Sequence, residues 1–156
     1  MATAKGRTTI EPQFRFIGVV DVEATCVEPR DPTFQMEIIE LPCVVVDTQT
    51  LQVVDEFDAH VRPVINPRLT DFCTALTGIK QETVDAAEPL PSVLSSFYQW
   101  LDSHGYQLGK NMTLASDGPW DFRDFLNGEC QMKGIKLPQG FEQWLNIRWA
   151  FASFFN

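Results

Sequence analysis

The chain has 156 residues, of which 44% are apolar and 12% aromatic, and this composition indicates one globular domain with a sizeable core. Its formal net charge of −9 argues against a protein that binds nucleic acid through many lysines and arginines. The charge leaves open an enzyme whose positive charge is supplied by bound metal ions.

The cysteines and the N-terminal segment predict a protein of a reducing compartment. Cys26, Cys43, Cys73 and Cys130 lie far apart and have no metal-binding spacing, so we expect four reduced thiols. Residues 1–13 contain no long apolar run, so we expect a flexible tail without a signal peptide. No apolar run reaches membrane-spanning length. We therefore expect a cytoplasmic or nuclear protein without membrane contact.

The segment after this tail has the pattern of β-strands. Runs rich in β-branched residues cover 14–25, 36–47 and 51–63, and their spacing predicts an antiparallel meander. Pro42 interrupts the second run and suits a strand end, an edge or a bulge. A buried strand is expected at 111–116, beside the first strand and parallel to it.

Helical patterns follow the third strand. Val93, Phe97 and Leu101 recur with helical spacing and Gly105 supplies a stop, which predicts a crossover helix at 91–103. The other expected elements are short helices at 67–76 and 80–87, a turn and helix at 117–134, and a short strand leading into a helix at 144–156. Together the elements predict an α/β fold in a single domain, residues 14–156.

Two groups of acidic residues stand out at the ends of predicted strands. Asp21 and Glu23 are two apart, which on a strand places both on one face, where each raises the other's pKa. A divalent cation would relieve this repulsion, because carboxylate oxygens are good ligands for Mg²⁺. Simple hydration at an exposed strand end would explain the same pair. Asp117 suits a helix N-cap, whereas Asp121 does not cap and is placed to reach the adjacent strand.

Four motifs occur in order along the chain: "VVDVEATC", "RPVIN", "LTGI" and "SDGPWD". With these motifs, residues 14–156 closely resemble the Eri-type 3′–5′ exoribonucleases of the DEDDh exonuclease superfamily. The resemblance implies a ribonuclease H-like mixed sheet, an antiparallel three-strand meander plus parallel strands, flanked by helices. It also implies metal-dependent hydrolysis at the 3′ end of single-stranded RNA, with release of nucleoside 5′-monophosphates.

The resemblance further assigns catalytic and metal-binding roles to three acids. Asp21 and Glu23 fall on the first motif, and Asp121 falls on the second. In the family these acids hold two Mg²⁺ or Mn²⁺ ions, and Asp21 would bridge both. The two ions would activate water and stabilise the attacking and leaving oxygens.

Four positions are implied as contacts of the terminal nucleotide. Glu23 and Ala24 would pack against it through the backbone of the first motif. Leu76 and Trp120 would flank its base, since stacking on apolar or aromatic surfaces accepts any base. Both side chains would equally suit the hydrophobic core.

The chain departs from the family at the third motif, a His followed five positions later by a metal-binding Asp. Neither His60 nor His104 has an Asp at that spacing, and the sequence reaches Asn156 first. We therefore expect an exonuclease domain truncated before the third motif, lacking the last helix and inactive or nearly so. The run "WAFASFF" near the end would then expose an apolar face. The alternative is a non-catalytic paralogue that binds RNA or a protein partner.

Overall fold

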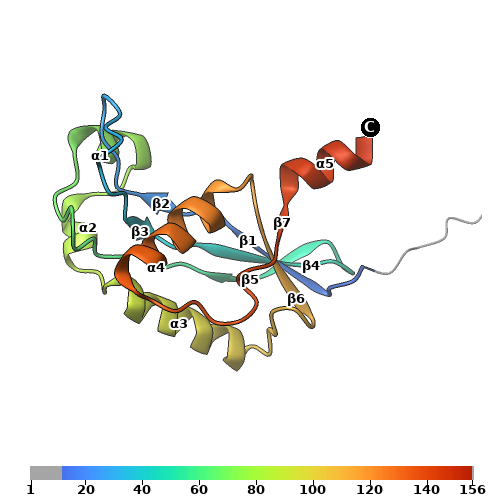
Figure 1. Ribbon diagram of the computed structural model, residues 1–156. Coiled ribbons are helices and arrows are strands. Elements are labelled where there is room, and N and C mark those ends of the chain that lie inside the picture. The colour runs from blue at the N-terminus through green and yellow to red at the C-terminus, as the bar shows by residue number, and fades with distance from the viewer. Residues whose placement is uncertain (1–11, 156) are drawn as a thin grey trace, which may run out of the picture.

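The computed structural model describes residues 12–155, which are built around a five-stranded mixed sheet (Figure 1). Its strands are β1 (Phe16–Val20), β4 (Cys43–Asp47), β5 (Gln52–Phe57), β6 (Met112–Ser116) and β7 (Trp144–Asn146). They lie in the order β5-β4-β1-β6-β7. The β1–β4 and β4–β5 pairs are antiparallel, and the β1–β6 and β6–β7 pairs are parallel. The predicted meander and the parallel strand beside its first member are confirmed.

A second, two-stranded sheet contains β2 (Glu23–Ala24) and β3 (Ile38–Glu40). The prediction of one strand across 14–25 is therefore wrong, because the run is divided between two sheets. The N–H of Val22 donates to a side chain rather than to a strand, which interrupts the ladder between β1 and β2. The run 36–47 is divided in the same way, between β3 and β4, at Pro42. The run 51–63 forms regular strand only as far as Phe57, and isolated bridges follow it.

The predicted helices are present with adjusted bounds. They are α1 (Asp71–Thr77), α2 (Gln81–Asp85), α3 (Leu90–Ser103), the π-helix η1 (Trp120–Leu126), α4 (Asn127–Lys133) and α5 (Ile147–Phe155). The Thr70 side chain accepts from Cys73 N and caps α1, and Gly134 ends α4 in the left-handed conformation. α3 leads from the meander to β6, as a crossover to a parallel strand requires. The π-helical turns of η1 were not expected from the sequence.

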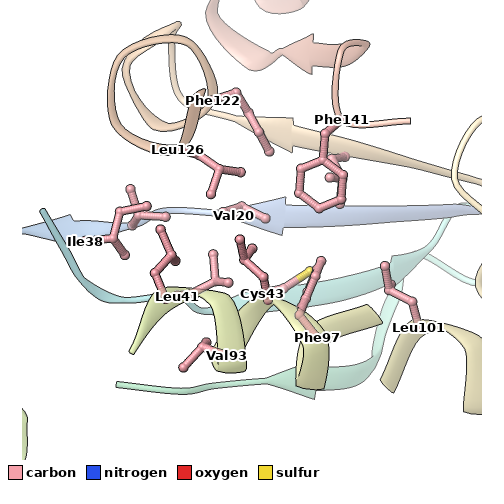
Figure 2. Packing of buried hydrophobic residues seen from close by; sticks show 14 of the residues in the cluster. Val20, Ile38, Leu41, Cys43, Val93, Phe97, Leu101, Phe122, Leu126 and Phe141 are labelled. Atoms are coloured by element: carbon pink, nitrogen blue, oxygen red, sulfur yellow. The ribbon is translucent and has the colours of Figure 1, made fainter. Parts of the chain in front are cut away.

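The hydrophobic core lies against one face of the main sheet. Figure 2 shows Val93 and Phe97 of α3, together with Phe122 and Leu126 of η1, gathered around Val20 of β1. Along β4 and most of β1, buried side chains alternate with half-buried or exposed ones, so the opposite face is only partly covered there by the described residues, whereas β6 is buried on both faces from Leu114 to Ser116. Gly18 leaves room for tight packing in β1, because a Cβ there would come within 2.5 Å of Met112 Cε and 3.0 Å of Cys43 Sγ, so these side chains would have to shift.

Helix α5 projects from the body of the molecule (Figure 1). None of its described side chains is buried, and Trp149, Phe151, Phe154 and Phe155 are all exposed. The apolar face expected near the end of the chain is thus open to solvent. In the stretch 12–155, no helix is long and apolar enough to cross a membrane. The predicted N-terminal tail falls mostly on residues 1–11, which lie outside the described residues.

Candidate active site

The three predicted acids lie where two parallel strands end. Asp21 directly follows β1, and Glu23 begins β2 two residues later. Asp121 lies in η1, which follows β6 after a short turn. Because β1 and β6 are parallel neighbours, their carboxyl ends open at the same edge of the sheet. Such an edge is the usual place for a ligand site in an open α/β sheet.

A direct hydrogen bond joins the two acidic segments. The Val22 N–H donates to Oδ1 of Asp121 at 3.0 Å, across 99 residues of sequence. The Asp121 side chain is only 5% exposed, so this bond fixes its orientation. Asp21 and Glu23 are not joined by a continuous strand. Their proximity to Asp121 therefore depends on this contact more than on the alternation of a strand.

The electrostatics of the acids show repulsion that is only partly compensated. Burial raises the pKa of Glu23, and the negative charges of Asp21, Glu40 and Asp121 raise it further. Burial also raises the pKa of Asp121. The Val22 N–H lowers it in part, and the charge of Asp21 adds to the increase. Among residues 12–155, no lysine, arginine or histidine forms an ion pair with Asp21, Glu23 or Asp121.

The donor set of this site suits Mg²⁺ or Mn²⁺. All three side chains offer hard carboxylate oxygens, and Mg²⁺ needs only one or two of them together with water and substrate phosphate. Within the described part of the chain, no group of three or more His, Cys, Asp or Glu side chains forms a preassembled metal cluster. The carboxylates therefore fit an ion by their chemistry and charge, and ion binding would have to draw them together.

Asp117, the other acid of the second motif, does not cap a helix as predicted. Its two carboxylate oxygens accept from Nε and Nη2 of Arg148 at 2.8 and 2.9 Å. The pair is exposed, and the Arg148 hydrogen bonds hold the pKa of Asp117 below its usual range. The capping expectation failed because α5 supplies a guanidinium that binds the carboxylate in bidentate fashion. No local sequence signal marked Arg148 as its partner.

Both side chains expected to flank a base are exposed rather than part of the core. Leu76 is 65% and Trp120 55% exposed, whereas Ala24 is buried behind the acids. The Arg123 guanidinium lies over the Trp120 ring, 5.7 Å from its centre. A cleft of about 580 Å³ opens beside Trp120. Its lining includes Cys26, Phe34, Met36, Trp120, Arg123 and Phe125. The alternative that Leu76 and Trp120 belong to the core is therefore wrong.

The two histidines are bound to carboxylates outside the three predicted acids. His60 Nε2 lies 3.2 Å from Glu40 Oε1, and His104 Nε2 lies 3.7 Å from Asp55 Oδ2. Glu40 was missed by the sequence analysis, although it pairs with Glu23 across β2 and β3. The "IIE" run showed that it belongs to a strand, but only the register places it beside the acids.

Comparison with known proteins places this chain in a family. Residues 19–156 match the family model of the exonucleases of RNase T type. The human protein named 3′–5′ exoribonuclease 1 is 41% identical over 142 residues, which cover 91% of this chain and 41% of the human protein. The chain thus spans less than half the length of that relative.

Two solved structures agree with the fold described above. The nuclease domain of 3′hExo, a DEDDh family member bound to rAMP, superposes with a TM-score of 0.86 at 42% identity, over 91% of this chain and 71% of that one. A structure of a 3′-exonuclease that recognises the histone mRNA stem-loop superposes with a TM-score of 0.85 at 41% identity, over 91% of this chain and 49% of that one. Family and fold were both predicted by the four motifs. The chain belongs to the exonuclease family, and within it to the DEDDh 3′–5′ exoribonucleases of the ERI1 and 3′hExo type.

Proposed function

We propose that this chain is the catalytic region of a metal-dependent exonuclease that removes nucleotides from the 3′ end of single-stranded RNA as nucleoside 5′-monophosphates. One observation carries the proposal. Asp21 and Glu23 after β1 and Asp121 after β6 lie at the same edge of the sheet, where burial and neighbouring acids raise the pKa values of Glu23 and Asp121, and no cation of the described residues neutralises them. A substrate with bound divalent ions would supply the missing positive charge.

Asp21, Glu23 and Asp121 would hold two Mg²⁺ or Mn²⁺ ions in this proposal. When bound, the ions would activate water and stabilise charge on the attacking and leaving oxygens. Asp21 is exposed and would bridge both ions, while the half-buried Glu23 would serve one. The Val22 N–H holds Oδ1 of Asp121, and Oδ2 would bind an ion.

The terminal nucleotide would lie between exposed apolar side chains. Trp120 directly precedes Asp121 and is exposed, so its ring would be available to stack on a base of any identity. Leu76 would contact the opposite side of that base, and the backbone at Glu23 and Ala24 would support the sugar. Known structures of relatives with rAMP and with an RNA stem-loop support this choice of substrate. The four unpaired thiols favour a cytoplasmic or nuclear setting.

A paired measurement of Mn²⁺ binding and RNA trimming tests the proposal. Calorimetry should show that the unmodified chain binds Mn²⁺ and that Asp21→Asn weakens binding by tenfold or more, about the effect of losing a ligand. Asp117→Asn is the matched control, because it removes an exposed acid of the same motif that binds Arg148. Equal loss in both variants, or no Mn²⁺ binding by the unmodified chain, would contradict the metal site.

Trimming of a 5′-labelled single-stranded oligoribonucleotide by these 156 residues should be slight. No histidine with the spacing of the family's third motif is present in the sequence, and the lack of a general base costs a rate factor of about 10² to 10⁴. The second candidate function, RNA binding without turnover, is favoured by His60 and His104 being paired with Glu40 and Asp55. Fast trimming that Asp21→Asn abolishes would exclude this second candidate and require His60, His104 or water as base.

A further inference from the structure

A buried cluster of two acids and one lysine lies in the interior near the second sheet. Glu37 is 0% and Glu129 3% exposed, and Lys133 of α4 lies between their carboxylates. Lys133 Nζ donates to Glu37 Oε1 at 2.7 Å and to Glu129 Oε1 at 2.5 Å. Neither acid belongs to the metal-binding set proposed above, so their burial needs another explanation.

The Glu37 carboxylate also binds a segment from another part of the chain. The N–H groups of Val64, Ile65 and Asn66 donate to its two oxygens at 2.8, 2.8 and 2.7 Å. The Asn66 side chain returns to the same region and donates to the Gln35 carbonyl at 2.7 Å. The motif "RPVIN" is thus a backbone segment held by the acid of "MEIIE", which accounts for a motif that the proposed chemistry does not use.

The same residues connect the two elements that carry the catalytic acids. Thr25, two residues after Glu23, binds the backbone of Glu37: its N–H donates to the Glu37 carbonyl at 2.8 Å, and its Oγ1 accepts from the Glu37 N–H at 2.9 Å. The second oxygen of Glu129 accepts from Ile38 N at 2.5 Å, at the start of β3. Glu129 and Lys133 belong to α4, which continues without a break from η1 and Asp121. The cluster therefore ties the β2–β3 sheet to the η1–α4 segment.

A purely structural role is the competing explanation. Buried ion pairs are poor sources of net stability, because apolar residues of similar volume often stabilise a protein equally or better. What a buried, fully hydrogen-bonded cluster does provide is one fixed arrangement of the elements that it joins. Here the cluster joins the β2–β3 sheet, which carries Glu23, to the η1–α4 segment, which carries Asp121. The distance between these two elements decides whether the acids can share ions.

We propose that Glu37 is a positioning residue for the proposed metal site of Asp21, Glu23 and Asp121: linked through Lys133 to Glu129, it fixes the β2–β3 sheet and the 64–66 segment relative to η1. The inference rests on the proposed function, since it assigns Glu37 to the geometry of that metal site. Removing this carboxylate should loosen the contact between Val22 and Asp121, although neither residue touches Glu37.

The test uses Glu37→Gln and a control that is destabilised elsewhere. In either orientation the amide NH₂ of Gln faces donors that Glu37 accepts from, so the clamp on 64–66 loses at least the bond from Val64 or those from Ile65 and Asn66. Leu101→Ala removes a buried side chain at the far end of α3 and serves as the control. Glu37→Asp keeps the charge but shortens the side chain, and it replaces Glu37→Gln if the latter does not fold.

Two readouts separate positioning from loss of stability. Amide exchange of Val22 should become about tenfold faster in Glu37→Gln than in Leu101→Ala, and Mn²⁺ should bind about tenfold more weakly. Val22 exchange needs no metal, so it tests the inference even if the unmodified chain binds no Mn²⁺ and the proposed function fails. Val22 exchange and Mn²⁺ affinity that match the control would overturn the inference, for Glu37→Gln and for Glu37→Asp alike.

Discussion

Two groups of carboxylates within this one domain are built in opposite ways. Glu37 and Glu129 are deeply buried, yet a lysine and four backbone N–H groups satisfy their oxygens. Asp21, Glu23 and Asp121 share one edge of the sheet, and no lysine, arginine or histidine of residues 12–155 pairs with them; the Val22 N–H and the Ser116 side chain compensate only Asp121, and only in part. We call the first group the buried cluster and the second the acidic site.

The pKa directions express this contrast for Glu37, while the pKa of Glu129 is raised because burial outweighs its hydrogen bonds from Ile38 and Lys133. The pKa of Glu37 is lowered, because hydrogen bonds from Lys133 and the backbone outweigh the burial that alone would raise it. The pKa values of Glu23 and Asp121 are raised by burial and by neighbouring acids. Charge that the fold compensates contributes to structure, whereas charge that it leaves uncompensated is available to bind a cation.

The largest effect should follow removal of the lysine from the buried cluster. Lys133→Met leaves two buried carboxylates facing each other, and breaking a buried pair in this way costs about 3–5 kcal/mol. Urea denaturation at pH 7 should show this loss. Adding Glu129→Gln should restore much of it, because the Gln oxygen still accepts from Ile38 N and its amide donates toward Glu37. A double variant no more stable than Lys133→Met would break the account of the buried cluster.

A smaller effect is expected when protons compete with metal at the acidic site. Because the pKa values of Glu23 and Asp121 are raised, both begin to bind protons at higher pH than ordinary carboxyls. Affinity for Mn²⁺ should therefore fall by about tenfold or more from pH 7 to pH 5, as calorimetry would measure. Glu37, whose pKa is lowered, should keep its stabilising contribution above its unfolded pKa and lose it only as pH falls through the lower folded value. An affinity that stays constant down to pH 5 would contradict the crowding of these acids.

The difference between the two groups also explains what the sequence could predict. Asp21, Glu23 and Asp121 were identified because short motifs carry them, and the strands that bring them to one edge have a clear β-branched pattern. The Val22 N–H contact could not be predicted, because it joins residues 99 apart through a break in the strand pattern. Sequence periodicity predicts regular strands and helices. The Val22–Asp121 contact instead lies between β1 and β2 and in the first turn of η1, where no regular pattern marks it.

The buried cluster was missed for a related reason. Glu37 stands in an otherwise apolar run, and nothing local distinguishes it from a solvated strand residue. Its hydrogen-bond partners lie in the 64–66 segment and in helix α4, far away in the sequence. Only the tertiary fold therefore reveals that Glu37 is buried and that its carboxylate oxygens are hydrogen-bonded. The same holds for Asp117, whose capping pattern was overridden by Arg148 from α5.

The most direct test of the contrast is a comparison of the same acid-to-amide change in both groups, in metal-free buffer with chelator at pH 7. Glu37→Gln should lower the free energy of unfolding by about 2 kcal/mol, since it leaves buried donors unsatisfied. Asp121→Asn keeps an oxygen for the Val22 N–H and removes a repelled charge, so it should raise the free energy of unfolding by about 1 kcal/mol. Saturating Mn²⁺ should then stabilise the unmodified chain but not Asp121→Asn. Opposite signs for the two changes are the predicted result, and a loss of stability in both would contradict the account.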